Sequence, residues 1–164
     1  MSEITNIQSL INSIPDPEVP VLTINDLGII REINIISPNK SVEIKITPTY
    51  SGCPAMDVIS TSIRLTLLKN GYRDVIITKI LSPAWTTDWM SENGKQKLKS
   101  YGIMPPGKFK QPDPSVLFAE ATNVQCPQCN SYNTSLISEF GSTACKALYQ
   151  CNDCREPFDH FKCH

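Results

Sequence analysis

Four cysteines near the C-terminus have the type and spacing of a metal site. They form two Cys-x-x-Cys pairs, Cys126 with Cys129 and Cys151 with Cys154, and 21 residues separate the pairs. In this pattern, two knuckles bring four thiolates to the corners of a tetrahedron, the arrangement that zinc prefers. Ligand type alone leaves a single iron or an iron–sulfur cluster open. Four unrelated cysteines, or two disulfides, are the remaining interpretation.

The same end of the chain carries further candidate ligands. Cys145 lies between the two pairs, and Cys163 and His164 form a Cys-His tail. All three are candidates for substitute or second-site ligands. The alternative is that Cys145 is a small buried thiol and that the tail plays no part. His160 falls within an apolar stretch, where a histidine more often packs than binds a metal.

Cys53 is a second, separate candidate for chemistry. It follows a predicted strand and precedes Pro54, which suits the first position of a predicted helix, so Cys53 is expected at the N-cap. A thiol there faces unpaired backbone N–H groups and the positive end of the helix dipole, which lowers its pKa and favours a reactive or metal-binding thiolate. The alternative is a buried residue without chemical consequence.

Three carboxylates in nearby loops are candidates to support Cys53. Asp16 and Glu18 lie in a proline-bounded loop, and Asp26 follows shortly after. They would help Cys53 to hold a transient metal ion or cluster. The alternative, favoured on chemistry alone, is that they are solvated residues of proline turns.

Catalytic groups are not evident. The chain has two histidines, and both stand in the terminal module, so no nucleophile–base arrangement can be proposed. Trp85 and Trp89 form a local aromatic concentration. They are predicted either to lie in the core or to anchor a protein interface.

The elements that position these residues can be read from periodicity. Apolar residues at helical spacing predict a helix over residues 4–14 that Ser2 caps, and β-rich runs at 28–37 and 41–50 predict an antiparallel hairpin. A helix over 54–70, with its apolar stripe on the hairpin, a strand over 74–81 and a helix over 91–101 follow. Between the cysteine pairs, alternation predicts the hairpin of a zinc ribbon.

These elements predict an α/β (α+β) protein in two parts. Residues 1–104 form a small two-layer domain with a β-hairpin and helices, 105–123 a proline-rich linker, and 124–164 the zinc-ribbon module. A module of this size buries too little apolar surface to be stable alone, so the metal is expected to supply most of its folding free energy.

Composition limits the classes of function. Fifteen basic and sixteen acidic residues leave a formal charge of -1, so no global field recruits nucleic acid or an anionic membrane. The chain shows neither a leader peptide nor a run of the roughly 20 apolar residues that span a bilayer, so a cytoplasmic protein is expected. Seven cysteines, an odd number, fit metal thiolates in a reducing compartment better than a disulfide framework.

Several of these motifs resemble known families. The segments Asp16–Pro20, Leu22–Gly28 and Thr49–Pro54 resemble the small α/β domain of SufT-like iron–sulfur assembly proteins. The segments Ser82–Met90 and Phe140–Tyr149, with the two cysteine pairs, are similar to the phenylacetate-degradation protein D family, which belongs to the bacterial phenylacetyl-CoA 1,2-epoxidase complex. The similarity runs from about residue 10 to the end.

This resemblance implies a role in aerobic phenylacetate degradation, beside other chains that form a multicomponent oxygenase and its reductase. It implies a component that has no catalytic activity of its own and serves maturation or assembly of iron or iron–sulfur centres, with Cys53 as the functional thiol. Two alternatives stay open. One is an electron-transfer component with iron on the four terminal thiolates, and the other is a purely structural, zinc-dependent interaction component.

Overall fold

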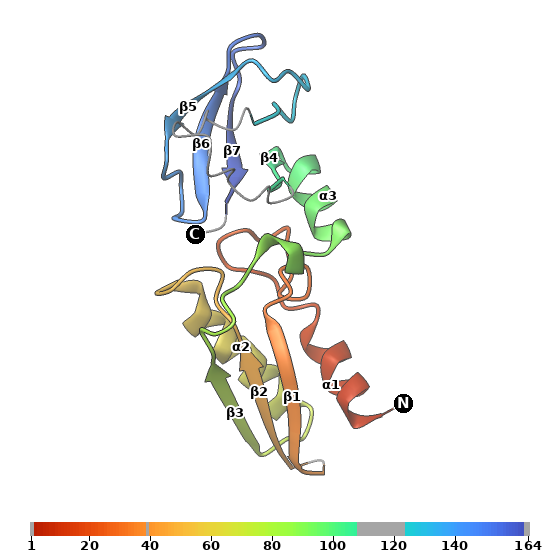
Figure 1. Cartoon of the computed structure of the whole chain (residues 1–164). Coiled ribbons are helices and arrows are strands. Elements are labelled where there is room, and N and C mark those ends of the chain that lie inside the picture. The colour runs from red at the N-terminus through yellow and green to blue at the C-terminus, as the bar shows by residue number, and fades with distance from the viewer. Residues whose placement is uncertain (1, 39, 108–123, 163–164) are drawn as a thin grey trace. The chain divides into compact units, whose positions relative to one another are not determined.

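The computed structural model describes residues 2–38, 40–107 and 124–162. The chain divides into two compact units, Met1–Gly94 and Lys95–His164, which are treated separately below. The fold is mixed α+β, with one small sheet in each unit (Figure 1). Within the described residues, no helix combines the length and the apolar character that a membrane span requires.

The first unit opens with a capped amphipathic helix, α1 (Glu3–Ile11). The Ser2 hydroxyl accepts a hydrogen bond from the N–H of Thr5 at 3.3 Å, which satisfies one of the free donors at the helix start. Ile7 and Ile11 point into the core and are fully buried. The predicted opening helix and its cap are therefore confirmed.

A three-stranded sheet forms the other layer of this unit. Strand β1 (Ile30–Ser37) pairs antiparallel with β2 (Ser41–Ile46), and β2 pairs parallel with β3 (Asp74–Lys79). Helix α2 (Ala55–Lys69) connects β2 to β3 and lies on one face of the sheet (Figure 1). It buries the predicted stripe of Met56, Ile59, Ile63 and Leu67.

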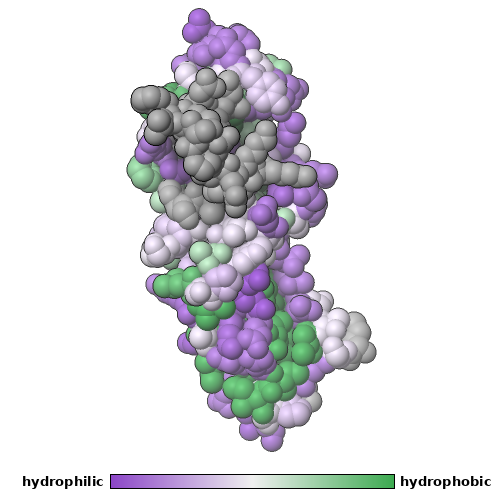
Figure 2. Space-filling model, in the orientation of Figure 1, coloured by the Kyte–Doolittle hydropathy of each residue, from purple (hydrophilic) through white to green (hydrophobic). Residues whose placement is uncertain are grey.

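The opposite face of this sheet is lined mainly by polar pairs. Lys45 Nζ lies 2.7 Å from Glu32 Oε2, and the Thr78 hydroxyl donates to Glu43 Oε1 at 2.7 Å. Ile76 stands on the same face and is 49% exposed. Figure 2 shows hydrophilic and hydrophobic side chains next to one another on the surface of this unit.

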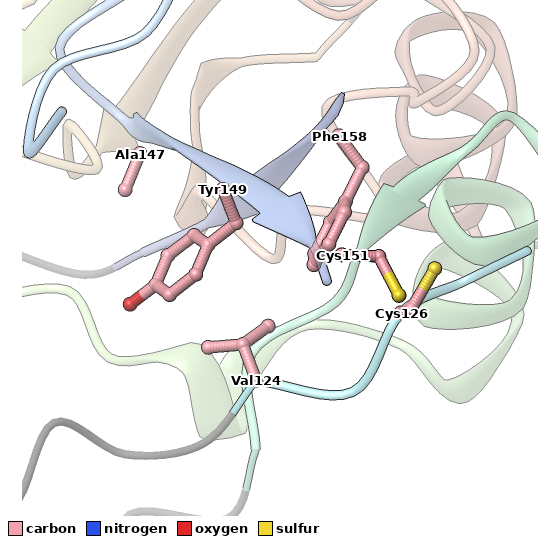
Figure 3. Packing of buried hydrophobic residues seen from close by; sticks show 6 residues of the cluster. All are labelled: Val124, Cys126, Ala147, Tyr149, Cys151 and Phe158. Atoms are coloured by element: carbon pink, nitrogen blue, oxygen red, sulfur yellow. The ribbon is translucent and has the colours of Figure 1, made fainter. Parts of the chain in front are cut away.

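The second unit contains the predicted ribbon hairpin and more. Its sheet has the order β4-β7-β6-β5, where β5 (Thr134–Ser138), β6 (Lys146–Cys151) and β7 (Pro157–Phe161) run antiparallel to their neighbours. Strand β4 (Ile103–Met104) adds to β7 in parallel. The core of this sheet consists of Val124, Cys126, Ala147, Tyr149, Cys151 and Phe158 (Figure 3).

The boundary between the units falls within helix α3 (Glu92–Ser100), which follows a short 3-10 turn, η1 (Thr87–Trp89). The sequence placed the end of the first domain at residue 104, whereas β4 belongs to the ribbon sheet through its pairing with β7. Most of the expected linker, 105–123, lies outside the described residues.

Candidate metal centre

The first knuckle is a tight turn closed by three hydrogen bonds. The N–H of Cys126 donates to the carbonyl of Ser131 at 2.8 Å, and the N–H of Asn130 donates to the carbonyl of Cys126 at 2.9 Å. Asn130 has φ of 60°, a left-handed conformation that asparagine tolerates better than most residues. The side-chain amide of Gln125 donates to the Asn130 carbonyl at 2.9 Å and holds this residue in place.

The second knuckle repeats this geometry. Cys151 N–H donates to the Glu156 carbonyl at 3.0 Å, and Arg155 N–H donates to the Cys151 carbonyl at 3.0 Å. Arg155 has φ of 66°, and the side chain of Gln150 donates to its carbonyl at 3.4 Å. The two Gln-Cys-x-x-Cys segments are therefore a structural repeat, which sequence reasoning missed although the glutamine before each pair was visible.

The two knuckles bring their sulfurs into one compact group. The Sγ atoms of Cys126 and Cys154 lie 3.7 Å apart, and those of Cys129 and Cys151 lie 3.5 Å apart. All four sulfurs lie within 4.8 Å of one another. Figure 3 shows Cys126 and Cys151 at the end of the ribbon core, with their sulfurs adjacent.

These distances fit one metal ion. Four metal–sulfur bonds of about 2.3 Å in a tetrahedron give sulfur–sulfur edges of about 3.8 Å. In the part of the chain that the structure describes, no other group of three or more His, Cys, Asp or Glu side chains has ligand atoms this close together. The four cysteines therefore form a metal-binding site of the ribbon type.

Polar side chains tie the second knuckle to the strand that follows the first. Asp153 accepts hydrogen bonds from the Ser131 hydroxyl and, at 2.7 Å, from the Asn133 amide. These two donors, Ser131 first, hold the pKa of Asp153 below its usual value. The Asn152 amide also donates to Asn133 Oδ1 at 3.0 Å. The network fixes the two knuckles relative to each other independently of the sulfurs.

The sulfurs do not share one ionisation behaviour. The N–H of Cys154, followed by weaker contributions, lowers the pKa of Cys151 to about 7. For Cys154, the N–H of Glu156 lowers the pKa, but desolvation and the neighbouring sulfurs outweigh it and raise the pKa to about 12. Without a cation, four thiolates cannot coexist at this distance. Metal binding must therefore release protons from the group.

The additional candidate ligands lie apart from this group. The buried Cys145 is not a member of it, and its Sγ lies 3.0 Å from the Thr143 hydroxyl. His160 packs edge-on against the Tyr149 ring, and burial followed by the charge of Lys162 lowers its pKa to about 4. Cys163 and His164 lie outside the described residues.

Cys53 stands one residue before the N-cap of α2. The helix begins at Ala55 with Pro54 as its N-cap, so the prediction that Cys53 caps the helix is wrong. The thiol is 9% exposed. Burial raises the pKa of Cys53, the N–H of Ala55 partly offsets this by donating to the sulfur, and the Glu18 carboxylate raises the pKa further. The net shift is upward, opposite to the direction expected from the helix dipole.

The three candidate carboxylates do not act together. Asp16 and Glu18 are near enough to Cys53 to raise its pKa. The Asp16 carboxylate also accepts the N–H groups of Glu18, at 2.9 Å, and Val19, at 2.7 Å. Asp26 is engaged elsewhere and clasps two loops, because its carboxylate accepts from the Thr23 and Ser91 hydroxyls at 3.0 Å each.

The two tryptophans have different environments. Trp85 is buried, and its Nε1–H donates to the Leu27 carbonyl at 2.8 Å, so its ring belongs to the core. Trp89 is partly exposed, with the Arg31 guanidinium 3.5 Å above its ring centroid. Of the two, Trp89 is the one whose ring is open to a partner.

Comparison with known proteins identifies the family. A protein of Escherichia coli (strain K12), named as the D component of a "Putative 1,2-phenylacetyl-CoA epoxidase", is 48% identical over 161 residues, which cover 98% of this chain and 93% of that protein. The chain belongs to the family of this epoxidase component. A family model described as the PaaD zinc beta ribbon domain matches residues 110–162, which include all four clustered cysteines.

The first unit has matches of its own within this epoxidase-component family. A family model described as an iron-sulfur cluster assembly protein matches residues 4–70, the span from α1 through α2. A crystal structure of a domain of unknown function, DUF59, from Bacillus anthracis superposes with a TM-score of 0.53 and 23% identity, over 57% of this chain and 89% of that one. The latter likeness establishes the fold of the unit.

Proposed function

We propose that the protein is an accessory subunit of a phenylacetyl-CoA epoxidase system, without catalytic activity of its own. In this role it assists the maturation of iron or iron–sulfur centres on another subunit. The ribbon would hold structural zinc, and Cys53 would be the functional thiol. The observation that carries the proposal is the combination in one chain of a closed four-sulfur site with an assembly-type domain that presents a single thiol beside carboxylates.

The geometry of the sulfur group supports a structural role for its metal. Four protein ligands complete a tetrahedron and leave no position for a substrate or water, which is typical of structural zinc. The match to a zinc ribbon model favours zinc over iron. Zinc has no redox chemistry under these conditions, so it would supply folding free energy to the ribbon and no electron transfer.

The environment of Cys53 supports a role that begins when a cation arrives. A thiol with a raised pKa is a poor nucleophile at neutral pH, which argues against covalent or redox chemistry by Cys53 alone. The negative potential that raises this pKa is also the potential that attracts a cation. A metal ion as cargo would displace the thiol proton and be balanced by the carboxylates of Asp16 and Glu18.

The test pairs two cysteines that differ in the proposed role. Cys53→Ser and Cys145→Ser are each co-expressed with the other subunits of the system, and the iron content of those subunits is measured after anaerobic purification. Both cysteines are buried and lie outside the sulfur group, so Cys145→Ser is a matched control. Iron in the recipient should fall for Cys53→Ser alone, while zinc in this chain stays constant. Wild-type iron content in the Cys53→Ser complex would refute the delivery role.

One observation favours a second candidate, a purely structural interaction subunit. In the described part of the chain, Cys53 does not belong to any group of three potential ligands within 4.8 Å. For such a subunit, Cys53→Ser is silent and Cys126→Ser abolishes association with the other subunits. An electron-transfer subunit is distinguished by its metal, because a colourless protein that contains zinc alone excludes it.

A further inference from the structure

Helix α2 carries a second apolar stripe on the side opposite to the core. Val58, Leu65 and Leu68 are 53%, 51% and 40% exposed. With Thr61 they follow the spacing i, i+3, i+7, i+10, which places them in one line along a helix of 3.6 residues per turn. The core residues Ile59, Ile63 and Leu67 lie on the other side of the helix. The set Val58, Thr61, Leu65 and Leu68 is called the outer stripe below.

The fold of the unit does not account for the outer stripe. A helix that covers one face of a sheet needs a single apolar face, and its outward face is normally polar. Exposed aliphatic residues that stand singly need no explanation, but a line of them along a helix is the pattern of a helix-binding seam.

Charged residues next to the outer stripe are cationic. Arg64 and Lys69 flank its C-terminal half on opposite sides, by their positions on the helix. Among the described residues, neither forms an ion pair, whereas the helix's acidic residue, Asp57, is bound to Lys79 at 2.6 Å. The surface offered by α2 is therefore an apolar line between two free cations.

This charge pattern selects between two kinds of occupant. If a second copy packed its outer stripe against this one in antiparallel orientation, Arg64 would face Arg64 of that copy, and in parallel orientation Arg64 would face Lys69. Like charges across a helix pair disfavour both arrangements. A helix with acidic residues beside its apolar positions would instead pair both cations.

We propose that the outer stripe of α2 is the docking surface for an amphipathic helix of another subunit. That helix carries leucine-type residues at spacing i, i+3 or i+4, i+7, and Asp or Glu residues beside them. The 15 residues of α2 span about 22 Å, which matches a partner helix of about four turns. The inference rests on the accessory-subunit part of the proposed function and not on metal delivery.

Site-specific crosslinking tests the surface in the whole complex. A photoreactive benzoylphenylalanine replaces Leu65 in the full chain, which is co-expressed with the other subunits of the system. The control places the same residue at Ile76, which is 49% exposed on the opposite face of the sheet. Leu65 should crosslink to an acidic amphipathic segment of a partner subunit, and Ile76 should not. Zinc content and circular dichroism verify folding of both proteins.

A charge-reversal variant tests the second half of the proposal. Arg64→Glu with Lys69→Glu should reduce the Leu65 crosslink about three- to tenfold, from the loss of two exposed ion pairs. Lys40→Glu with Lys99→Glu makes the same change in net charge away from α2 and should leave the crosslink unchanged. An equal loss in both variants would overturn the acidic partner.

The remaining outcomes also decide the proposal. Crosslinking of Leu65 to a second copy of this chain, to a neutral or basic segment, or to nothing would refute it. Equal crosslinking from Leu65 and Ile76 would do the same. If Leu65 crosslinks as expected while Cys53→Ser leaves recipient iron at wild-type level, the docking surface stands and the delivery role fails.

Discussion

The glutamine before each knuckle should tune metal affinity, and Gln125 is the sharper case. In Gln125→Met the side chain keeps its length but loses the amide that donates to the Asn130 carbonyl at 2.9 Å. An exposed neutral hydrogen bond contributes about 0.5 to 1 kcal/mol. Because metal binding and ribbon folding are one equilibrium, this loss should weaken zinc binding about two- to fivefold.

The second knuckle supplies an internal scale for this effect. The corresponding contact of Gln150 is 3.4 Å long, beyond the usual range for N–H···O bonds, so Gln150→Met should weaken binding less than about twofold. Gln128→Met is the matched control, since Gln128 lies in the first knuckle but is exposed and makes neither of these contacts.

Competition for zinc between the full chain and a chromogenic chelator, at constant pH, measures all three variants. Circular dichroism verifies that the first unit stays folded. The reasoning is refuted if Gln125→Met binds zinc as tightly as the wild type, or if Gln128→Met loses as much affinity as Gln125→Met. A larger loss for Gln150→Met than for Gln125→Met would contradict the ranking by hydrogen-bond length.

Three further predictions concern stability, measured by urea denaturation. Trp85→Phe leaves the buried Leu27 carbonyl without its donor at 2.8 Å, so unfolding free energy should fall by about 1 to 3 kcal/mol. Gly28→Ala should cost more than about 2 kcal/mol, because φ is 65° and a Cβ would lie 2.2 Å from the Trp89 carbonyl oxygen. Since the pKa of His160 is held at about 4 when folded, against 6.5 when unfolded, protons favour the unfolded ribbon. Its stability should therefore fall as pH drops from about 6.5 to 4, and less in His160→Gln at equal zinc.

Regular elements were predictable because their signals are local. The alternation of Val42, Ile44 and Ile46 with charged neighbours is a property of the strand itself, and all three are fully buried as expected. The helical stripe of α2 and the grouping of the four ribbon cysteines follow from spacing in the same way.

The features that sequence reasoning missed depend on contacts distant along the chain or on a shift of one residue. The pKa of Cys53 is set by burial and by Glu18 in a separate loop, neither of which its neighbours in sequence reveal. Its N-cap assignment failed because α2 begins one residue later than Pro54 suggested. Strand β4 is two residues long and becomes a strand only through β7, more than fifty residues further along the chain.

The repeated knuckles also have a consequence for how the ribbon is made. Each knuckle closes through backbone bonds between residues no more than five positions apart, so each can form without the other. During synthesis the Cys126–Cys129 turn is complete before Cys151 leaves the ribosome. Loop-closure entropy grows only slowly with length, so the intervening hairpin adds little to the cost of bringing the second turn to the first. Ligand capture is therefore vectorial, with a two-thiolate half-site as its natural intermediate.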